Sequence, residues 1–178
     1  MGLLSKVMGR NRADMRDAAK IYRQVMLQSR KPEFFGAERF ADNYDGRIDI
    51  LTFNLCIIMK RLREFGENGQ ILSQAIFDTL RDDFEIALRE EGISDKGVAT
   101  RIKPMIQLFY DRLKAYDAAL NDKTLSKTLS DKLELKNTSE FTKSLDVYGM
   151  ALFAHLGELS LGDIAKAKFT FPNLIYEL

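Results

Sequence analysis

The sequence contains few of the residues on which most catalytic and metal sites depend. Among 178 residues there is one cysteine and one histidine. Cys56 therefore cannot form an internal disulfide, and its apolar surroundings predict a buried, reduced thiol. His155 has no companion ligands at the spacing of a zinc site, and no Glu-x-x-His pair occurs for a di-metal site. We expect no catalytic residues, no metal and no cofactor.

Motifs for phosphate, nucleic acid and membrane spanning are missing as well. The chain has no glycine-rich phosphate loop and no basic and aromatic pattern of a known nucleic-acid module. The longest apolar run, 48–59, would rise about 18 Å as a helix, against a hydrocarbon core of about 30 Å. The start shows no signal peptide, and Lys6 stands where a myristoylation signal needs Ser or Thr. We expect no membrane span, no DNA and no small-molecule substrate.

Helix-breaking residues are scarce, with 3 prolines and 11 glycines, and strand-like alternation is nearly absent. Hydrophobic residues make up 46% and charged residues 30%, which are ordinary values for one globular domain of this length. The sequence therefore predicts an all-α, single-domain bundle of six to seven helices.

The centre of that bundle is predicted to be an antiparallel helical hairpin at 76–120. Apolar residues recur in steps of three and four on both of its halves, which is the period of one helical face. The turn falls at Gly92, which suits a helix end, and at Ser94, which can cap the next helix. Pro104 predicts a kink or a break near Lys103.

The other segments are assigned from the same periodicity. Residues 45–65 are apolar on most sides, so this helix is predicted to be central. Residues 30–44 are predicted to form a linker held to the body by Phe34, Phe35 and Phe40. The remaining predictions are a first helix at 10–29, a weak helix at 121–137, a stronger one capped by Ser139, a short one at 160–167, and an apolar tail at 168–178. The tail either docks in a groove or extends as a partner-binding arm.

Charge is unevenly distributed along the chain. Residues 1–31 carry a net charge of +6, so the remainder carries −5 of the overall +1. We therefore separate a basic N-terminal helix, 1–34, from a helical domain, 35–178. The basic helix is predicted either to pack with a solvated face or to contact anionic lipid or RNA. The cations assigned to this anionic-surface contact are Arg12, Arg16, Lys20 and Arg23.

Three separated blocks resemble the ubiquinol–cytochrome c chaperone family. They are 43–62, with Tyr44-Asp45-x-Arg47-x-Asp49, then 77–120, with Phe109-Tyr110-Asp111-Arg112, and finally Phe171-Pro172. The similarity covers roughly residues 35–172 in the same order. It implies an assembly chaperone for respiratory complex III, which is not an enzyme and which binds newly made cytochrome b near the ribosome exit together with a small partner protein.

Compared with mitochondrial members of that family, we expect the chain to lack a transit peptide and much of their long N-terminal region. We therefore expect a bacterial form in the cytoplasm, peripheral to the inner membrane; the mitochondrial matrix is the eukaryotic equivalent. The expected partners are cytochrome b or another complex III subunit, with the ribosome and an anionic membrane surface as further candidates.

The hairpin and the family blocks predict an apolar groove that shields a membrane segment of the partner. The residues predicted to bind the partner are Tyr44, Asp45, Arg47, Asp49, Phe84, Phe109, Tyr110, Tyr116, Phe171 and Pro172. The alternative for the aromatic members is burial in the core. Two other functions stay open at this point: a ribosome, RNA or membrane-surface adaptor acting through the basic helix, and an enzyme of unknown chemistry.

Overall fold

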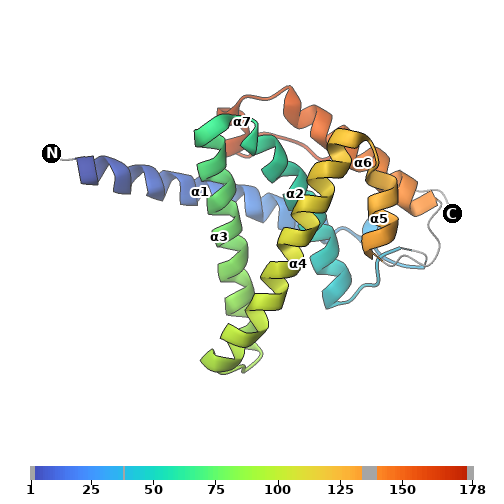
Figure 1. The fold of residues 1–178 in the computed structure, drawn as a ribbon, viewed down its shortest axis with the longest axis horizontal. Coiled ribbons are helices and arrows are strands. Elements are labelled where there is room, and N and C mark those ends of the chain that lie inside the picture. Colours follow the sequence, from blue (N-terminus) through green and yellow to red (C-terminus); the bar gives the residue numbers. More distant parts are fainter. Residues whose placement is uncertain (1–2, 38, 134–139, 176–178) are drawn as a thin grey trace.

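A computed structural model describes residues 3–37, 39–133 and 140–175 of the chain. These residues form seven α-helices, one short 3-10 helix and no strand, which confirms the predicted all-α bundle (Figure 1). In order, the elements are α1 (Leu3–Ser29), η1 (Pro32–Phe34), α2 (Tyr44–Arg63), α3 (Gly66–Glu90), α4 (Asp95–Asp122), α5 (Leu125–Leu133), α6 (Glu140–Gly157) and α7 (Leu161–Ala165).

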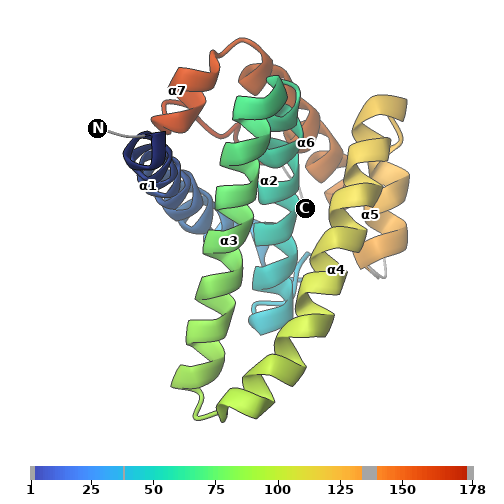
Figure 2. The same cartoon turned by 60° about the vertical axis from the view of Figure 1, so that its left-hand side comes forward.

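Helix α2 is the central element, as its apolar sequence predicts. It contacts α1, α3, α4 and α6, and Figure 2 shows it between these helices. Every residue from Ile50 to Lys60 is buried. The helix begins where the side chain of Asn43 accepts a hydrogen bond from the Gly46 N–H at 2.9 Å. Gly46 is buried against the preceding turn, and a Cβ there would overlap the carbonyl oxygen of Ala41.

Helices α3 and α4 form the predicted antiparallel hairpin, and they meet at the turn seen at the bottom of Figure 2. Gly92 adopts a φ of +80°, and Ser94 accepts from the Gly97 N–H at 3.4 Å. A break near Lys103 is wrong, because α4 continues from Asp95 to Asp122 with Pro104 inside it. Pro104 removes the hydrogen bond to the Thr100 carbonyl, but both residues lie on an exposed face, where water can replace the lost donor.

A polar network inside the core joins α1, α2 and α6. The Tyr148 hydroxyl donates to Asn54 Oδ1 at 2.9 Å, and Asn54 Nδ2 donates to Ser29 Oγ at 3.0 Å. Gln28 donates to the Tyr148 oxygen at 3.3 Å. All four side chains are buried, so these bonds replace the water that each group loses on folding. The network fixes the relative positions of three helices.

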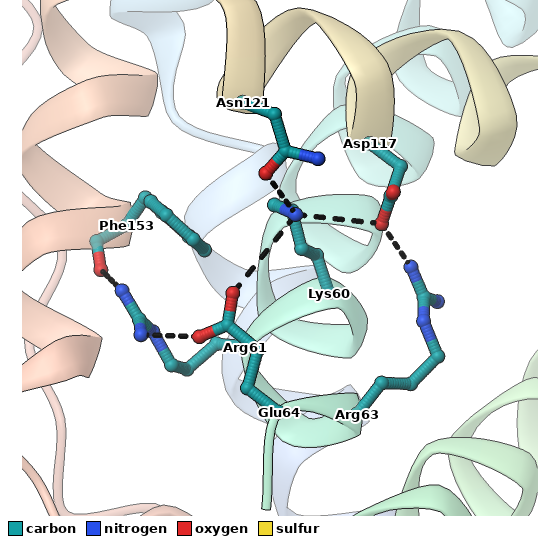
Figure 3. A network of polar contacts seen from close by, with 7 residues as sticks. All are labelled: Lys60, Arg61, Arg63, Glu64, Asp117, Asn121 and Phe153. Carbon is teal, nitrogen blue, oxygen red and sulfur yellow. Dashed lines mark hydrogen bonds and ion pairs between the residues drawn. The ribbon is translucent and has the colours of Figure 1, made fainter.

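A second network ties the end of α2 to α4 and α6 (Figure 3). Lys60 is buried and donates to Asn121 Oδ1 at 2.8 Å, and Asp117 lies 2.5 Å from Arg63. The Arg61 guanidinium lies 4.0 Å from the centroid of the Phe153 ring and donates to the Phe153 carbonyl at 3.0 Å. The cations at this helix end therefore have anionic, carbonyl and aromatic partners, and they hold the bundle together.

The segments on either side of the bundle core pack onto it. The linker prediction is confirmed, because Phe34, Phe35 and Phe40 are all buried. Helix α1 begins at Leu3, earlier than predicted, and packs on α3, α2 and α7 (Figure 1). The start predicted for α6 at Ser139 lies outside the described residues.

The tail is docked, which decides between the two alternatives for its described part. Phe169 is buried, and its carbonyl accepts from Gln24 Nε2 at 2.6 Å. The Thr170 N–H donates to His155 Nε2 at 3.4 Å, which gives that histidine a structural partner. The tail thus links α1 to α6.

Candidate functional site

Two adjoining hollows open along the first turns of α2, and we call them together the α2 groove. They share the side chains of Tyr44, Ile48 and Phe84, so they form one continuous depression. Tyr44 stands between them and is 49% exposed. Helices α3 and α4 diverge from their shared turn (Figure 2), and residues of α1, α3 and α4 line the groove beside the start of α2.

The first hollow has a volume of about 180 Å³ and lies between α1, α2 and α3. Met26, Leu51 and Ala87 contribute apolar walls, while Arg30 and Arg47 stand at its exposed rim. Arg47 is paired with Asp42 at 2.8 Å. Asp83 also lines this hollow and accepts from the Tyr22 hydroxyl at 2.7 Å. This contact joins α1 to α3.

Together with burial, Asp83 raises the pKa of Tyr22 well above its usual range, so this tyrosine stays neutral. Tyr44 also has a raised pKa, because of partial burial and the nearby carboxylates of Glu91, Asp45 and Asp83. Neither phenol therefore adds a negative charge to the groove at neutral pH.

The second hollow has a volume of about 190 Å³ and lies between α2, α3 and α4. Phe84, Met105, Leu108 and Phe109 line it with apolar side chains. Leu108 is 46% exposed, so it lies at the mouth, whereas Phe109 is buried. The hollow is therefore open to a partner, and its sides are apolar.

A charged pair also lines this second hollow. Arg112 Nη2 lies 3.3 Å from Asp49 Oδ1, and Arg112 Nη1 donates to the Tyr116 oxygen at 3.5 Å. Burial raises the pKa of the Asp49 carboxyl, and the Arg112 charge offsets part of that rise. Asp45 and Thr52 are further polar residues of this mainly apolar lining. Such polar groups can orient whatever enters.

The structure brings together six of the residues predicted to bind a partner. Tyr44, Asp45, Arg47, Asp49, Phe84 and Phe109 all line the α2 groove. Tyr110 lies outside it, 44% exposed, with its ring centroid 5.0 Å from that of Phe77. Tyr116 is buried with 1% of its surface exposed and packs edge-on against Phe53. Phe171 and Pro172 are half-buried in the docked tail, away from the groove lining.

The four cations predicted to contact an anionic surface lie exposed on α1. Arg12, Arg16, Lys20 and Arg23 are all on the solvent side of the described part of this helix. Lys20 pairs with Asp17 at 2.8 Å, which neutralises part of the charge. The opposite side of the helix carries the buried Ala18, Ile21 and Val25.

Several groove residues were not predicted from the sequence. Met105 and Leu108 belong to a helix whose apolar stripe was predicted to be core, and Ile48 to a helix predicted to be buried on most sides. Arg112 carries a weak signal that could have been found, because it falls between Phe109 and Tyr116 on a mostly apolar face. A cation at that position needs a buried partner, and Asp49 provides it.

The described residues hold no group of three or more His, Cys, Asp or Glu side chains placed to bind a metal ion. Cys56 is fully enclosed in α2, where burial raises the pKa of its thiol far above its usual range. None of the described helices is long and apolar enough to cross a bilayer. The α2 groove, with its mainly apolar walls and its Arg112–Asp49 ion pair, is the candidate site.

The comparisons with known proteins agree with the fold. Residues 38–171 match the family model described as ubiquinol-cytochrome C chaperone. A crystal structure of the Cbp3 homolog from Brucella abortus resembles the chain with a TM-score of 0.78 and 25% sequence identity, over 97% of this chain and 98% of that one. No protein with a curated function gives a significant match.

Proposed function

Because the chain belongs to the ubiquinol–cytochrome c chaperone family, we propose that it assists assembly of complex III by binding newly made cytochrome b. The family assigns a chaperone role in the assembly of ubiquinol–cytochrome c reductase. The identity of the client, the manner of binding and the place of action are our proposal. We place the protein in a bacterial cytoplasm, peripheral to the inner membrane where the client is inserted.

The observation that carries this proposal is the open, mainly apolar α2 groove, whose second hollow is lined entirely by residues of the family match. A membrane segment that has not yet paired with its neighbours exposes apolar side chains, and these lose contact with water when they enter an apolar groove. Tyr44 and Leu108 are half-exposed at the groove, so a client can reach the walls formed by Phe84 and Phe109. Because it shields apolar surface without forming bonds, such a site fits a chaperone better than an enzyme.

Photocrosslinking in cells tests the identity of the client. A photoreactive amino acid at position 44 should capture cytochrome b, because this side chain stands between the two hollows. The matched control is the same amino acid at position 147, where Val147 is exposed but does not line the groove. Equal capture from both positions, or capture of proteins unrelated to complex III from position 44, would show that the groove does not hold this client.

A second candidate function is favoured by the exposed cations of α1. We propose that Arg12, Arg16, Lys20 and Arg23 hold the chaperone at an anionic surface, either a membrane or a ribosome, close to where the client is made. Such charge contacts weaken as salt rises. Cosedimentation with anionic vesicles and, separately, with ribosomes distinguishes the two surfaces.

For these four cations, replacement with alanine should abolish the salt-sensitive sedimentation. Replacement of three exposed cations elsewhere, Lys96, Arg101 and Lys103 on α4, is the control and should leave it intact. Sedimentation that ignores salt and survives the α1 substitutions would remove this candidate function without affecting the client proposal.

A further inference from the structure

The ion pair in the second hollow has hydrogen-bonding capacity that its own surroundings leave unused. The side chain of Arg112 is 10% exposed and that of Asp49 is 23% exposed. A guanidinium has five N–H donors, yet Arg112 makes two contacts among the described residues, at 3.3 and 3.5 Å. Both distances are at the outer limit of a hydrogen bond. The hollow therefore presents donors and acceptors that a ligand can satisfy.

The charge of this pair restricts the ligand. The charges of Arg112 and Asp49 offset each other, and the exposed Asp45, which also lines the hollow, adds one negative charge. An entering carboxylate would therefore meet two carboxylates, and an entering ammonium would meet Arg112. Like charges close together in a partly desolvated site repel each other strongly. A neutral group that both donates and accepts satisfies both partners. A hydroxyl has this property.

The walls of the hollow restrict the rest of the ligand. The rings of Phe84 and Phe109 and the side chains of Met105 and Leu108 surround a volume of about 190 Å³. Aromatic rings pack favourably against other rings edge-on and against methionine sulfur. The combination of apolar walls and a hydroxyl-binding pair matches a phenol.

We propose that the second hollow takes a tyrosine side chain of the client, whose hydroxyl donates to Asp49 and accepts from Arg112. Tyrosine is enriched among the residues that dominate binding energy at protein interfaces, because its ring is apolar and its tip is polar. This inference rests on the proposed chaperone function for the origin of the tyrosine. The hollow itself belongs to the folded chain and can be tested without the client.

The test is a titration of the isotope-labelled full chain with three probes. Binding is monitored by the shifts of the amide resonances in NMR spectra. The probes are N-acetyl-tyrosinamide, N-acetyl-phenylalaninamide and N-acetyl-para-carboxyphenylalaninamide. We expect saturable shifts in 44–52 and 105–112, with a Kd of about 1 mM for the tyrosine probe. The phenylalanine probe should bind about tenfold more weakly, because it leaves the ion pair unsatisfied. The carboxylate probe should bind most weakly.

The variant Asp49→Asn makes the test sharper. It leaves the Arg112 charge without its carboxylate, so the carboxylate probe should become the tightest of the three, by about tenfold. Asp111→Asn is the matched control, because it removes the same charge next to Arg112 in sequence from an exposed position that does not line the hollow. This control should bind the three probes in the same order of affinity as the wild-type protein.

The proposal fails if the phenylalanine probe binds as tightly as the tyrosine probe, because the hollow is then an apolar pocket. It also fails if the carboxylate probe is tightest in the wild type, or if no probe gives saturable shifts at the hollow. If Asp49→Asn does not fold, the order of the three probe affinities in the wild-type protein tests the proposal by itself. Loss of cytochrome b capture with the probe order intact would contradict the client proposal and leave the tyrosine site standing.

Discussion

Asn54 is a polar residue in the buried stretch of the central helix α2, and its side-chain oxygen depends on a hydroxyl from another helix for a hydrogen bond. The Tyr148 hydroxyl donates to its side-chain oxygen at 2.9 Å, and both residues are buried. Tyr148→Phe removes the donor and leaves that oxygen unsatisfied, which should lower the free energy of unfolding by about 1 to 3 kcal/mol. Urea unfolding followed by circular dichroism measures the loss.

The control for this change is Tyr110→Phe, because the Tyr110 side chain is 44% exposed. Water can replace whatever its hydroxyl loses, so the free energy of unfolding should change by about 0.5 kcal/mol or less. Equal losses in the two variants would show that the buried network contributes little to stability.

The protonation of Asp49 makes the stability of the folded chain depend on pH. Burial raises the pKa of its carboxyl in the folded chain, in spite of Arg112. The folded state therefore keeps a proton on Asp49 at a pH where the unfolded chain has lost it. Its contribution to stability is fully present below the unfolded pKa, about 3.9, and is lost as pH rises through the raised folded pKa.

The wild-type free energy of unfolding, minus that of Asp49→Asn, should therefore fall as pH rises above the unfolded pKa of about 3.9. Urea unfolding at several pH values measures this difference, with Asp111→Asn as the variant that should show no such trend. A difference that grows with pH would mean that the Arg112 charge outweighs burial.

At the scale of residues, apolar periodicity predicts which side chains face inward and gives no information on which polar groups pair. The stripe through Phe84 and Phe109 correctly places both on the inner side. Arg112 lies on the same face, but its partner Asp49 belongs to another helix, 63 positions earlier in the chain. Such a pairing depends on the angle between two helices, which no local pattern contains.

The docked tail is the element that the sequence left undecided. Its apolar residues suit either a groove or a free arm, and the structure shows Phe169 buried with its carbonyl bonded to Gln24. Phe169→Ala should lower the free energy of unfolding by about 3 to 5 kcal/mol, because it leaves a cavity between α1 and α6. Phe171→Ala, at a half-buried position, should cost about 1 kcal/mol.

Chemical denaturation of both variants checks these values. A loss of 1 kcal/mol or less for both would indicate that the tail is free in solution. For helices with a clear apolar stripe, such as α3 and α4, the sequence leaves no such alternative open, because their long periodic patterns predict them well. A break at Pro104 did not occur because the cost of a proline depends on solvent: on an exposed face water can bond to the freed carbonyl.

At the scale of the whole molecule, a groove next to the hairpin was predicted, and its position was only partly correct. Periodicity places Phe84 and Phe109 in the hairpin, but it does not give the angles at which α1, α3 and α4 meet the start of α2. The predicted site therefore included Tyr116, which the packing of Phe53 encloses. It omitted Ile48 and Leu108, whose role depends on how three helices meet.

Because the groove is built from side chains that the fold itself does not fully enclose, stability and client binding should separate. Leu108→Glu places a charge at the mouth of the second hollow, where the native side chain is 46% exposed. The free energy of unfolding should change by about 0.5 kcal/mol or less, since water reaches the new carboxylate. An apolar client segment would have to desolvate that charge on entry, which costs several kcal/mol unless it is paired.

Cells that carry this variant in place of the wild-type gene should therefore contain strongly reduced complex III and cytochrome b haem, measured by difference spectroscopy of their membranes. Val147→Glu introduces the same charge on α6, outside the groove, at a residue that is 68% exposed, and it should leave both unchanged. Normal complex III in a stably folded Leu108→Glu strain would mean that the client is held elsewhere on the molecule.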